Sequence, residues 1–139
     1  MSNKELLAKI TSNDVLARAL SVILLVPGVL HFAVPKPFDS IVPDELPGDK
    51  RAYTYVSGVA EVGIGAAVLV PSLRRRAALL AAALFTAVFP ANVNMVRLWQ
   101  DKGPLMKGIA VARLPLQIPM IILAILVWRG AKKPSDAQA

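Results

Sequence analysis

Four long apolar runs, separated by short polar connections, are the dominant pattern along this chain. An α-helix rises about 1.5 Å per residue, so about 20 apolar residues are enough to cross the hydrocarbon core of a bilayer. The pattern therefore predicts an all-α fold, an integral membrane four-helix bundle formed by one transmembrane domain over 1–139. The expected spans cover about 15–34, 53–70, 77–96 and 108–128.

The polar segments outside these runs predict three further features. Residues 1–13 carry apolar positions at helical spacing, which indicates either a short helix on the membrane surface or a partly ordered tail. Residues 35–52, between helices 1 and 2, are so rich in proline that we expect a proline-rich structured loop there and no regular helix. Apolar side chains within this loop favour its folding onto the mouth of the bundle. Residues 134–139 are expected to form a disordered tail.

Basic residues mark one side of the predicted bundle more strongly than the other. That side holds both termini and the short connection between the second and third spans, which contains Arg74, Arg75 and Arg76. Because short cytoplasmic loops are enriched in lysine and arginine, this triple arginine is a topology signal and predicts both termini in the cytoplasm. Trp99 and Trp128 stand near the ends of spans, where we expect them to anchor the chain at the membrane interfaces.

Composition narrows the chemistry that the chain can perform alone. Hydrophobic residues make up 55% and charged residues 18%, an apolar balance that few soluble domains of 139 residues carry. There is no cysteine, which excludes disulfides and thiolate metal sites, and the single histidine cannot supply two ligands to a haem. We expect no metal site and no intrinsic cofactor. The net charge of +7 comes from basic residues at the ends of apolar runs, which favours contact with the lipid bilayer and argues against nucleic acid.

Polar residues inside the spans gather in the outer half of the membrane. The second span runs inward from Tyr53, so Glu61 lies about 12 Å below the outer boundary at about 1.5 Å per residue. The other spans place their polar side chains at a similar depth. Because an ionisable side chain facing lipid tails costs a few kcal/mol, Glu61 and Arg113 should face the interior and pair. The predicted cluster comprises His31, Tyr53, Ser57, Glu61, Asn92, Asn94, Arg113 and Gln117.

Two interpretations of this cluster stay open at the level of sequence. Glu61 and Arg113 form either a structural ion pair that sets helix register or part of a site for ligand binding, proton transfer or redox chemistry. Asn92 and Asn94 either complete that site or only bridge helices, and His31 either belongs to it or lies at the headgroup level. Four prolines within the spans favour bends and cavities, because each removes a backbone donor. They are Pro27, Pro90, Pro115 and Pro119.

Four stretches carry a recognisable set of motifs. They are GVLHFAVPKPFDSIVPDELPG at 28–48, YVSGVAEVGIGAAVLVP at 55–71, FPANVNM at 89–95 and RLPLQIP at 113–119. The set resembles the DoxX-like family of small four-helix integral membrane proteins over about 28–128. The resemblance implies a fold in the bacterial plasma membrane. It does not imply a single activity, since that family includes the small subunit of a thiosulfate–quinone oxidoreductase and helpers of larger assemblies. A thiol-relay role is not open to a chain without cysteine.

These observations favour a non-catalytic accessory or assembly subunit of a larger bacterial membrane complex, such as a quinone-linked respiratory complex. The chain is small, has no cofactor motif of its own and presents small residues against which other membrane subunits can pack. The alternative is a membrane oxidoreductase subunit that binds a quinone or a lipid through His31, Glu61 and Arg113. A membrane chaperone is a further alternative. The sequence favours the absence of enzymatic activity in the chain alone but leaves that question open.

Overall fold

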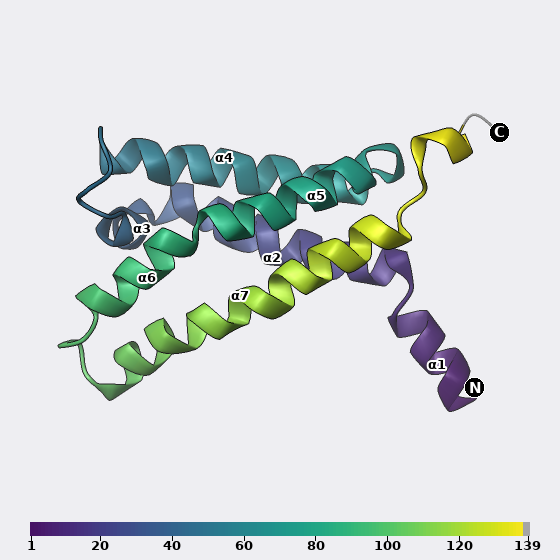
Figure 1. The fold of residues 1–139 in the computed structure, drawn as a ribbon, viewed down its shortest axis with the longest axis horizontal. Helices are drawn as coiled ribbons and strands as arrows, with labels where there is room; N and C mark the ends of the chain where they lie inside the picture. Colours follow the sequence, from purple (N-terminus) through teal and green to yellow (C-terminus); the bar gives the residue numbers. More distant parts are fainter. Residues whose placement is uncertain (138–139) are drawn as a thin grey trace.

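The computed structural model describes residues 1–137, and every regular element within them is helical (Figure 1). The long helices are α2 (Asn13–Ala33), α4 (Lys50–Leu69), α5 (Pro71–Ala87) and α7 (Pro104–Gly130). The short ones are α1 (Asn3–Ile10), α3 (Pro35–Ile41), α6 (Phe89–Leu98) and the 3-10 helix η1 (Pro134–Ala137). The predicted all-α class is confirmed for the described chain.

Four helical stretches are long and apolar enough to cross a membrane, as expected for a multi-pass membrane protein. They are Asn13–Ala33, Lys50–Leu69, Pro71–Leu98 and Pro104–Asp136. Each of the four spans expected from the apolar runs overlaps one of them. The hydrophobic pattern therefore located the long helices correctly, although their ends differ by several residues from the expected ones.

The four long helices pack side by side in the cyclic order α2, α4, α5, α7 (Figure 1). α2 contacts α4 and α7, and α5 contacts the same two helices, so α4 and α7 lie diagonally opposite each other. Figure 1 shows α3, the start of α4 and the turn between α6 and α7 at one end, with α1 and η1 at the other. We call these the cavity end and the arginine end, after the features described below.

Glycines bring α2 and α4 into close contact, as small residues do in membrane helix pairs. A Cβ atom added to Gly58 would lie 2.7 Å from Phe32 Cε2 and 2.9 Å from His31 Cβ. A Cβ atom added to Gly65 would lie 3.0 Å from Leu25 Cγ. A larger residue at either position would push the helices apart, so these glycines set the spacing that holds His31 against α4.

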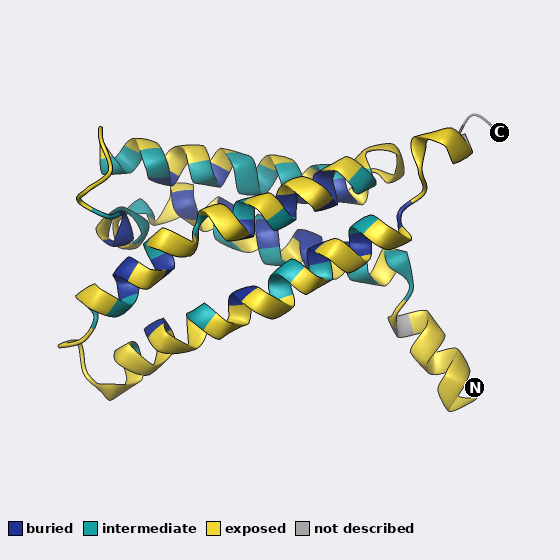
Figure 2. Ribbon diagram, in the orientation of Figure 1, coloured by how far each residue is buried: buried dark blue, intermediate teal, exposed yellow. Residues whose placement is uncertain are grey.

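The larger apolar core lies toward the arginine end, and all four long helices contribute buried residues to it (Figure 2). Leu20, Leu24 and Val68 are each 0% exposed there. Buried alanines of α5 and α7 complete this core and let the helices approach closely. Ser21 is also buried in this half, at 2% exposed, and its hydroxyl donates to the Gly65 carbonyl at 2.8 Å.

Arginine side chains close the end of the bundle beyond this core. Arg74 Nε donates to the Val68 carbonyl at 2.9 Å, and Arg74 Nη1 donates to Asn13 Oδ1 at 3.2 Å. Arg75 Nη1 donates to the Trp128 carbonyl at 2.9 Å. These carbonyls stand at helix ends, where backbone acceptors have no partner within the helix. Arg74 and Arg75, expected as topology residues, thus also tie the ends of α2, α4 and α7 to the start of α5.

The third predicted span is divided into two helices. α5 ends at Ala87 and α6 begins at Phe89, with Pro90 in its first turn. Proline has no backbone N–H and its ring clashes with the preceding turn, so a helix bends or ends there. Gln117 Nε2 donates to the Phe85 carbonyl at 2.5 Å and so satisfies an acceptor near the break.

Two expectations about the connecting segments are corrected by the structure. The segment 35–52 contains α3, a helix of seven residues that begins with Pro35. Proline is tolerated in a first helical turn because the N–H groups there have no intrahelical partner, so proline density did not exclude a helix. Pro134–Ala137 form η1 within the tail expected to be disordered, whereas 138–139 lie outside the described residues.

Candidate functional site

A cavity of about 330 Å³ lies at the cavity end, between the long helices and the short helices α3 and α6. Most of the polar residues predicted from membrane depth line it: His31, Tyr53, Ser57, Glu61, Asn92 and Arg113. Apolar side chains of α3 and the connection after it also line it, as expected for a segment that folds onto the bundle mouth. The volume falls at the lower end of the range typical of small-molecule sites, about 300–1,000 Å³.

His31 and Glu61 meet where α2 and α4 approach most closely. His31 Nδ1 lies 3.3 Å from Glu61 Oε2, and the two side chains are only 10% and 13% exposed. The same nitrogen lies 2.6 Å from the carbonyl oxygen of Pro27, and the His31 ring stacks on Phe38 with ring centroids 3.8 Å apart. Glu61 Oε2 is buried and accepts no hydrogen bond from any described residue. The pair therefore leaves hydrogen-bonding capacity unused beside the cavity.

Arg113 lines the cavity from α7, but within residues 1–137 it forms no ion pair with Glu61, so the predicted direct pair is wrong. The helix order gives the reason. Glu61 is on α4 and Arg113 on α7, which lie diagonally opposite, whereas α2 is a direct neighbour of α4 and brings His31 to Glu61. Arg113 is an exposed residue that also lines the cavity.

Ser57 and Asn92 add neutral polar groups to the wall. Asn92 is 5% exposed, and in the described part of the chain its side chain makes no hydrogen bond. Ser57 precedes Glu61 by one helical turn and lies on the same face of α4. A hydroxyl and an amide can each donate and accept, so the wall offers neutral partners next to charged ones.

Asn94 and Gln117, also predicted for the cluster, do not line the cavity but bridge helices at its edge. Asn94 Nδ2 donates to the Ile41 carbonyl at 3.0 Å, which ties α6 to the end of α3. Gln117 Nε2 donates to the Phe85 carbonyl, which ties α7 to α5. For Asn94 the structure supports the helix-bridging alternative, while Asn92, two residues earlier, faces the cavity.

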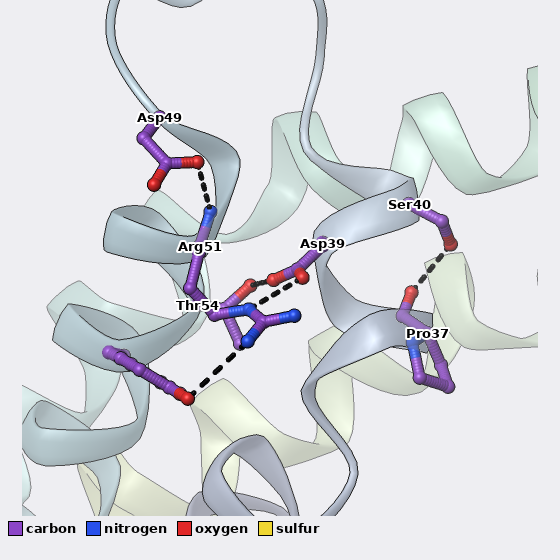
Figure 3. A network of polar contacts seen from close by, with 7 residues as sticks. Pro37, Asp39, Ser40, Asp49, Arg51 and Thr54 are labelled. Carbon is purple, nitrogen blue, oxygen red and sulfur yellow. Dashed lines mark hydrogen bonds and ion pairs between the residues drawn. The ribbon is translucent and has the colours of Figure 1, made fainter.

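Asp39 fastens α3 over the cavity, and the sequence analysis did not single it out. Thr54 Oγ1 donates to Asp39 Oδ1 at 2.6 Å, and Arg51 Nε donates to Asp39 Oδ2 at 2.7 Å (Figure 3). Both oxygens of the carboxylate are thus engaged by the first turns of α4. Partial burial raises the pKa of Asp39, but the hydrogen bonds from Thr54 and Arg51 outweigh it and bring the pKa below its usual value.

Aromatic residues stand at both ends of the bundle. At the cavity end, Tyr53 donates from its hydroxyl to the Pro47 carbonyl at 2.5 Å and so holds the connection between α3 and α4. Trp99 ends α6, with the Lys102 ammonium 5.5 Å from its ring centroid. At the arginine end, the Arg75 guanidinium lies 4.6 Å from the Trp128 ring centroid. Anchoring of the two tryptophans at membrane interfaces stays a prediction.

Phe38, Asp39 and Thr54 are the site residues that sequence reasoning missed. Their signal was weak, because an acid in a proline-rich segment and a threonine in an apolar helix have many explanations. The stacking of His31 on Phe38 depends on α3 being a helix, which the proline content obscured. The available clue was Thr54, a polar residue one turn into α4, together with Asp39, an acid in the segment before that helix.

A family model described as "Domain of unknown function (DUF8561)" matches residues 20–128. The matched segment contains every residue that lines the cavity and leaves out α1 and η1. No curated protein and no solved structure matches the chain. The resemblance to DoxX-like proteins therefore stays a prediction.

Proposed function

The chain belongs to the DUF8561 family, and we propose that it is a membrane-embedded four-helix bundle whose cavity binds the polar head of an amphipathic small molecule. A quinone is the favoured class of ligand and a lipid is the alternative. The observation that carries the proposal is the meeting of His31, Glu61 and Arg113 around one cavity of about 330 Å³. Ionisable side chains at membrane depth are expensive, and those that line a cavity are typical of ligand or ion sites.

The two kinds of lining residue support an amphipathic ligand. The polar residues come from α2, α4, α6 and α7, while apolar side chains such as Phe38, Ile41 and Leu46 cover them from the α3 side. Such a wall can pair the oxygens of a head group and pack against its ring. Because Arg113 is exposed while it lines the cavity, an apolar tail can pass beside it toward the surrounding lipid.

The orientation in the bacterial plasma membrane is part of the proposal. Arg74, Arg75 and Arg76 lie in the first two turns of α5, at the same end as α1 and η1. The enrichment of basic residues in short cytoplasmic loops favours this end in the cytoplasm. The cavity then opens in the outer half of the membrane.

A cavity-filling substitution tests the proposed binding. Ser57→Phe places a ring in the cavity, and we expect it to abolish calorimetric binding of a decyl-substituted benzoquinone or its hydroquinone in nanodiscs. Ser72→Phe, at an exposed position of α5 near the arginine end, is the matched control and should bind as the wild type does. Retention of binding by a folded Ser57→Phe protein would contradict the proposal. Exclusive retention of phospholipid by the wild type would favour the lipid alternative.

A second candidate function is that of an accessory subunit of a larger, quinone-linked membrane complex. A shallow groove of about 380 Å³ on the outside of α4 and α5 supports it. Ala60, Gly63 and Ala67 lie along this groove, and a Cβ atom added to Gly63 would meet no atom within 4 Å. Small residues on an outward face are typical of helices that pack against another transmembrane helix.

Filling this groove tests the second candidate. Gly63→Leu leaves the interior of the bundle untouched, so we expect it to abolish co-purification with a large membrane complex in mild detergent. Gly108→Leu is the matched control, because a Cβ atom there also meets no atom within 4 Å but lies on α7. Recovery of the wild type as a free monomer from its native membranes would contradict this candidate.

A further inference from the structure

The contact of His31 with Pro27 fixes which of its ring nitrogens carries the proton and which is free to accept a hydrogen bond. Nδ1 lies 2.6 Å from the Pro27 carbonyl oxygen, which can only accept a hydrogen bond. Nδ1 therefore carries the proton. In the neutral ring Nε2 is then an acceptor, and no described residue donates to it. His31 thus presents a hydrogen-bond acceptor to the cavity.

The balance of charges around the cavity indicates that Glu61 is also a hydrogen-bond acceptor. Among the described residues that line the cavity, Glu61, Arg113 and His31 are the groups that can carry charge near neutral pH. An ionised Glu61 and an ionised Arg113 with a neutral His31 give a sum of zero, and the positive charge of Arg113 on the same cavity favours the ionised carboxylate. An ionised carboxylate only accepts hydrogen bonds, and Glu61 Oε2 already lacks a donor within the described chain.

The opposite side of the cavity supplies donors. Arg113 on α7 has only N–H groups to offer, and Asn92 on α6 carries two amide N–H groups that no described residue engages. The cavity thus has an acceptor wall, formed by His31 and Glu61, and a donor side, formed by Asn92 and Arg113. A bound head group must match both.

This division distinguishes the two oxidation states of a quinone. A hydroquinone donates one hydroxyl to the acceptor wall, and the oxygen at its other end accepts from the donor side. A quinone has carbonyl oxygens alone, so one of them would face the Glu61 carboxylate and leave it unsatisfied. We propose that the cavity selects head groups that donate a hydrogen bond to His31 and Glu61, and hence a hydroquinone over the corresponding quinone. The inference rests on the proposed function and names its ligand class.

Three probes of nearly one shape test this selection on the wild-type protein. They are a decyl-substituted hydroquinone, its quinone and its dimethyl ether, titrated calorimetrically into the full chain in nanodiscs, without oxygen and at pH 8. We expect the hydroquinone to bind about tenfold more tightly than the quinone, because a buried acceptor left unpaired costs about that much. The dimethyl ether keeps the oxygens without the donors and should bind as weakly as the quinone.

A pair of matched substitutions assigns the selection to Glu61. The amide of Glu61→Gln can donate as well as accept, so we expect the two oxidation states to bind within about twofold of each other. Glu45→Gln removes the same charge from an exposed side chain in the connection after α3 and should keep the tenfold preference.

The outcomes separate the inference from the function on which it rests. Equal binding of hydroquinone, quinone and ether by the wild type would overturn the inference and leave the ligand-binding function standing. A preference that persists in Glu61→Gln would overturn the role of Glu61. Failure of the folded wild type to bind any probe would overturn both. The probe series needs no variant, so it decides the matter even if Glu61→Gln does not fold.

Discussion

At the arginine end Arg74 reaches Asp14 at 2.7 Å as well as Asn13 and the Val68 carbonyl, and its side chain is only 11% exposed. At the cavity end Glu61 is as well buried, at 13% exposed, yet its Oε2 has no donor among the described residues. At both ends an ionisable side chain is buried between apolar helices. Only at the arginine end is the charge surrounded by partners from the chain itself.

This difference separates a structural polar group from one available for binding. An unsatisfied buried polar group costs about 1–3 kcal/mol, so a chain that gives Arg74 several partners has no stability reason to leave Glu61 Oε2 without a donor. Proteins break such local rules mainly at functional sites. The contrast between the two ends therefore supports the cavity, and not the arginine cluster, as the place where a ligand binds.

The largest expected effect concerns packing at the arginine end. Leu24 is 0% exposed in the apolar core, so Leu24→Ala should lower the free energy of unfolding by about 2–5 kcal/mol. Val22, two residues away on α2 and 59% exposed, is the matched control, and Val22→Ala should change stability little. Equilibrium unfolding in mixed micelles measures both. If Ser57→Ala at the cavity costs as much as Leu24→Ala, the two ends do not differ in packing.

The next largest effect concerns the polar contacts of Arg74 at the arginine end. Arg74→Gln removes a charged donor from carbonyl and carboxylate partners and should lower the free energy of unfolding by about 1.5–3 kcal/mol. Arg76→Gln removes the same charge from an exposed neighbour and should cost less than about 0.5 kcal/mol. The same micelle unfolding assay compares them. Equal losses would mean that Arg74 acts through net charge alone and that the arginine end owes nothing to its hydrogen bonds.

The polar lining at the cavity end was largely predictable from the sequence, because it follows from the chemistry of each residue by itself. Glu61 and Arg113 were expected to turn inward, since lipid tails cannot solvate a charge. Both line the cavity, although Arg113 is an exposed residue. The partner of Glu61 was not predictable in this way. Depth places residues along the membrane normal, but which helices are neighbours depends on the close packing of Gly58 and Gly65 against α2.

The helix α3, which covers the cavity, was not predictable from the sequence for a different reason. Proline opposes a helix in its interior but suits its first turn, and the sequence does not state where a short helix begins. Phe38 and Asp39 acquire their roles only once Pro35 starts a helix, which turns them toward His31 and Thr54 respectively. The Arg74 contacts were likewise hidden behind the stronger topology signal.

The smallest expected effect concerns the attachment of α3 over the cavity. The pKa of Asp39 lies below its usual value of 3.8, so its contacts with Arg51 and Thr54 stabilise the folded state at neutral pH and are lost as the pH falls through that lowered pKa. The chain has no cysteine, so a spin label on Lys36→Cys reports on α3 alone. We expect the label to be immobilised at pH 7 and to become mobile once the pH falls below the lowered pKa of Asp39.

Asp39→Asn and Asp44→Asn separate this attachment from a general acid effect. Asp39→Asn removes the charge but keeps the shape, so the label should already be mobile at pH 7 and should change little on acidification. Asp44 pairs with Lys50 at the start of α4 and not with a residue of α3, so Asp44→Asn should keep the wild-type response. A label that stays immobile in Asp39→Asn would mean that Phe38 and the apolar lining hold α3 without the carboxylate. The cover of the cavity would then depend on packing, as the core of the arginine end does.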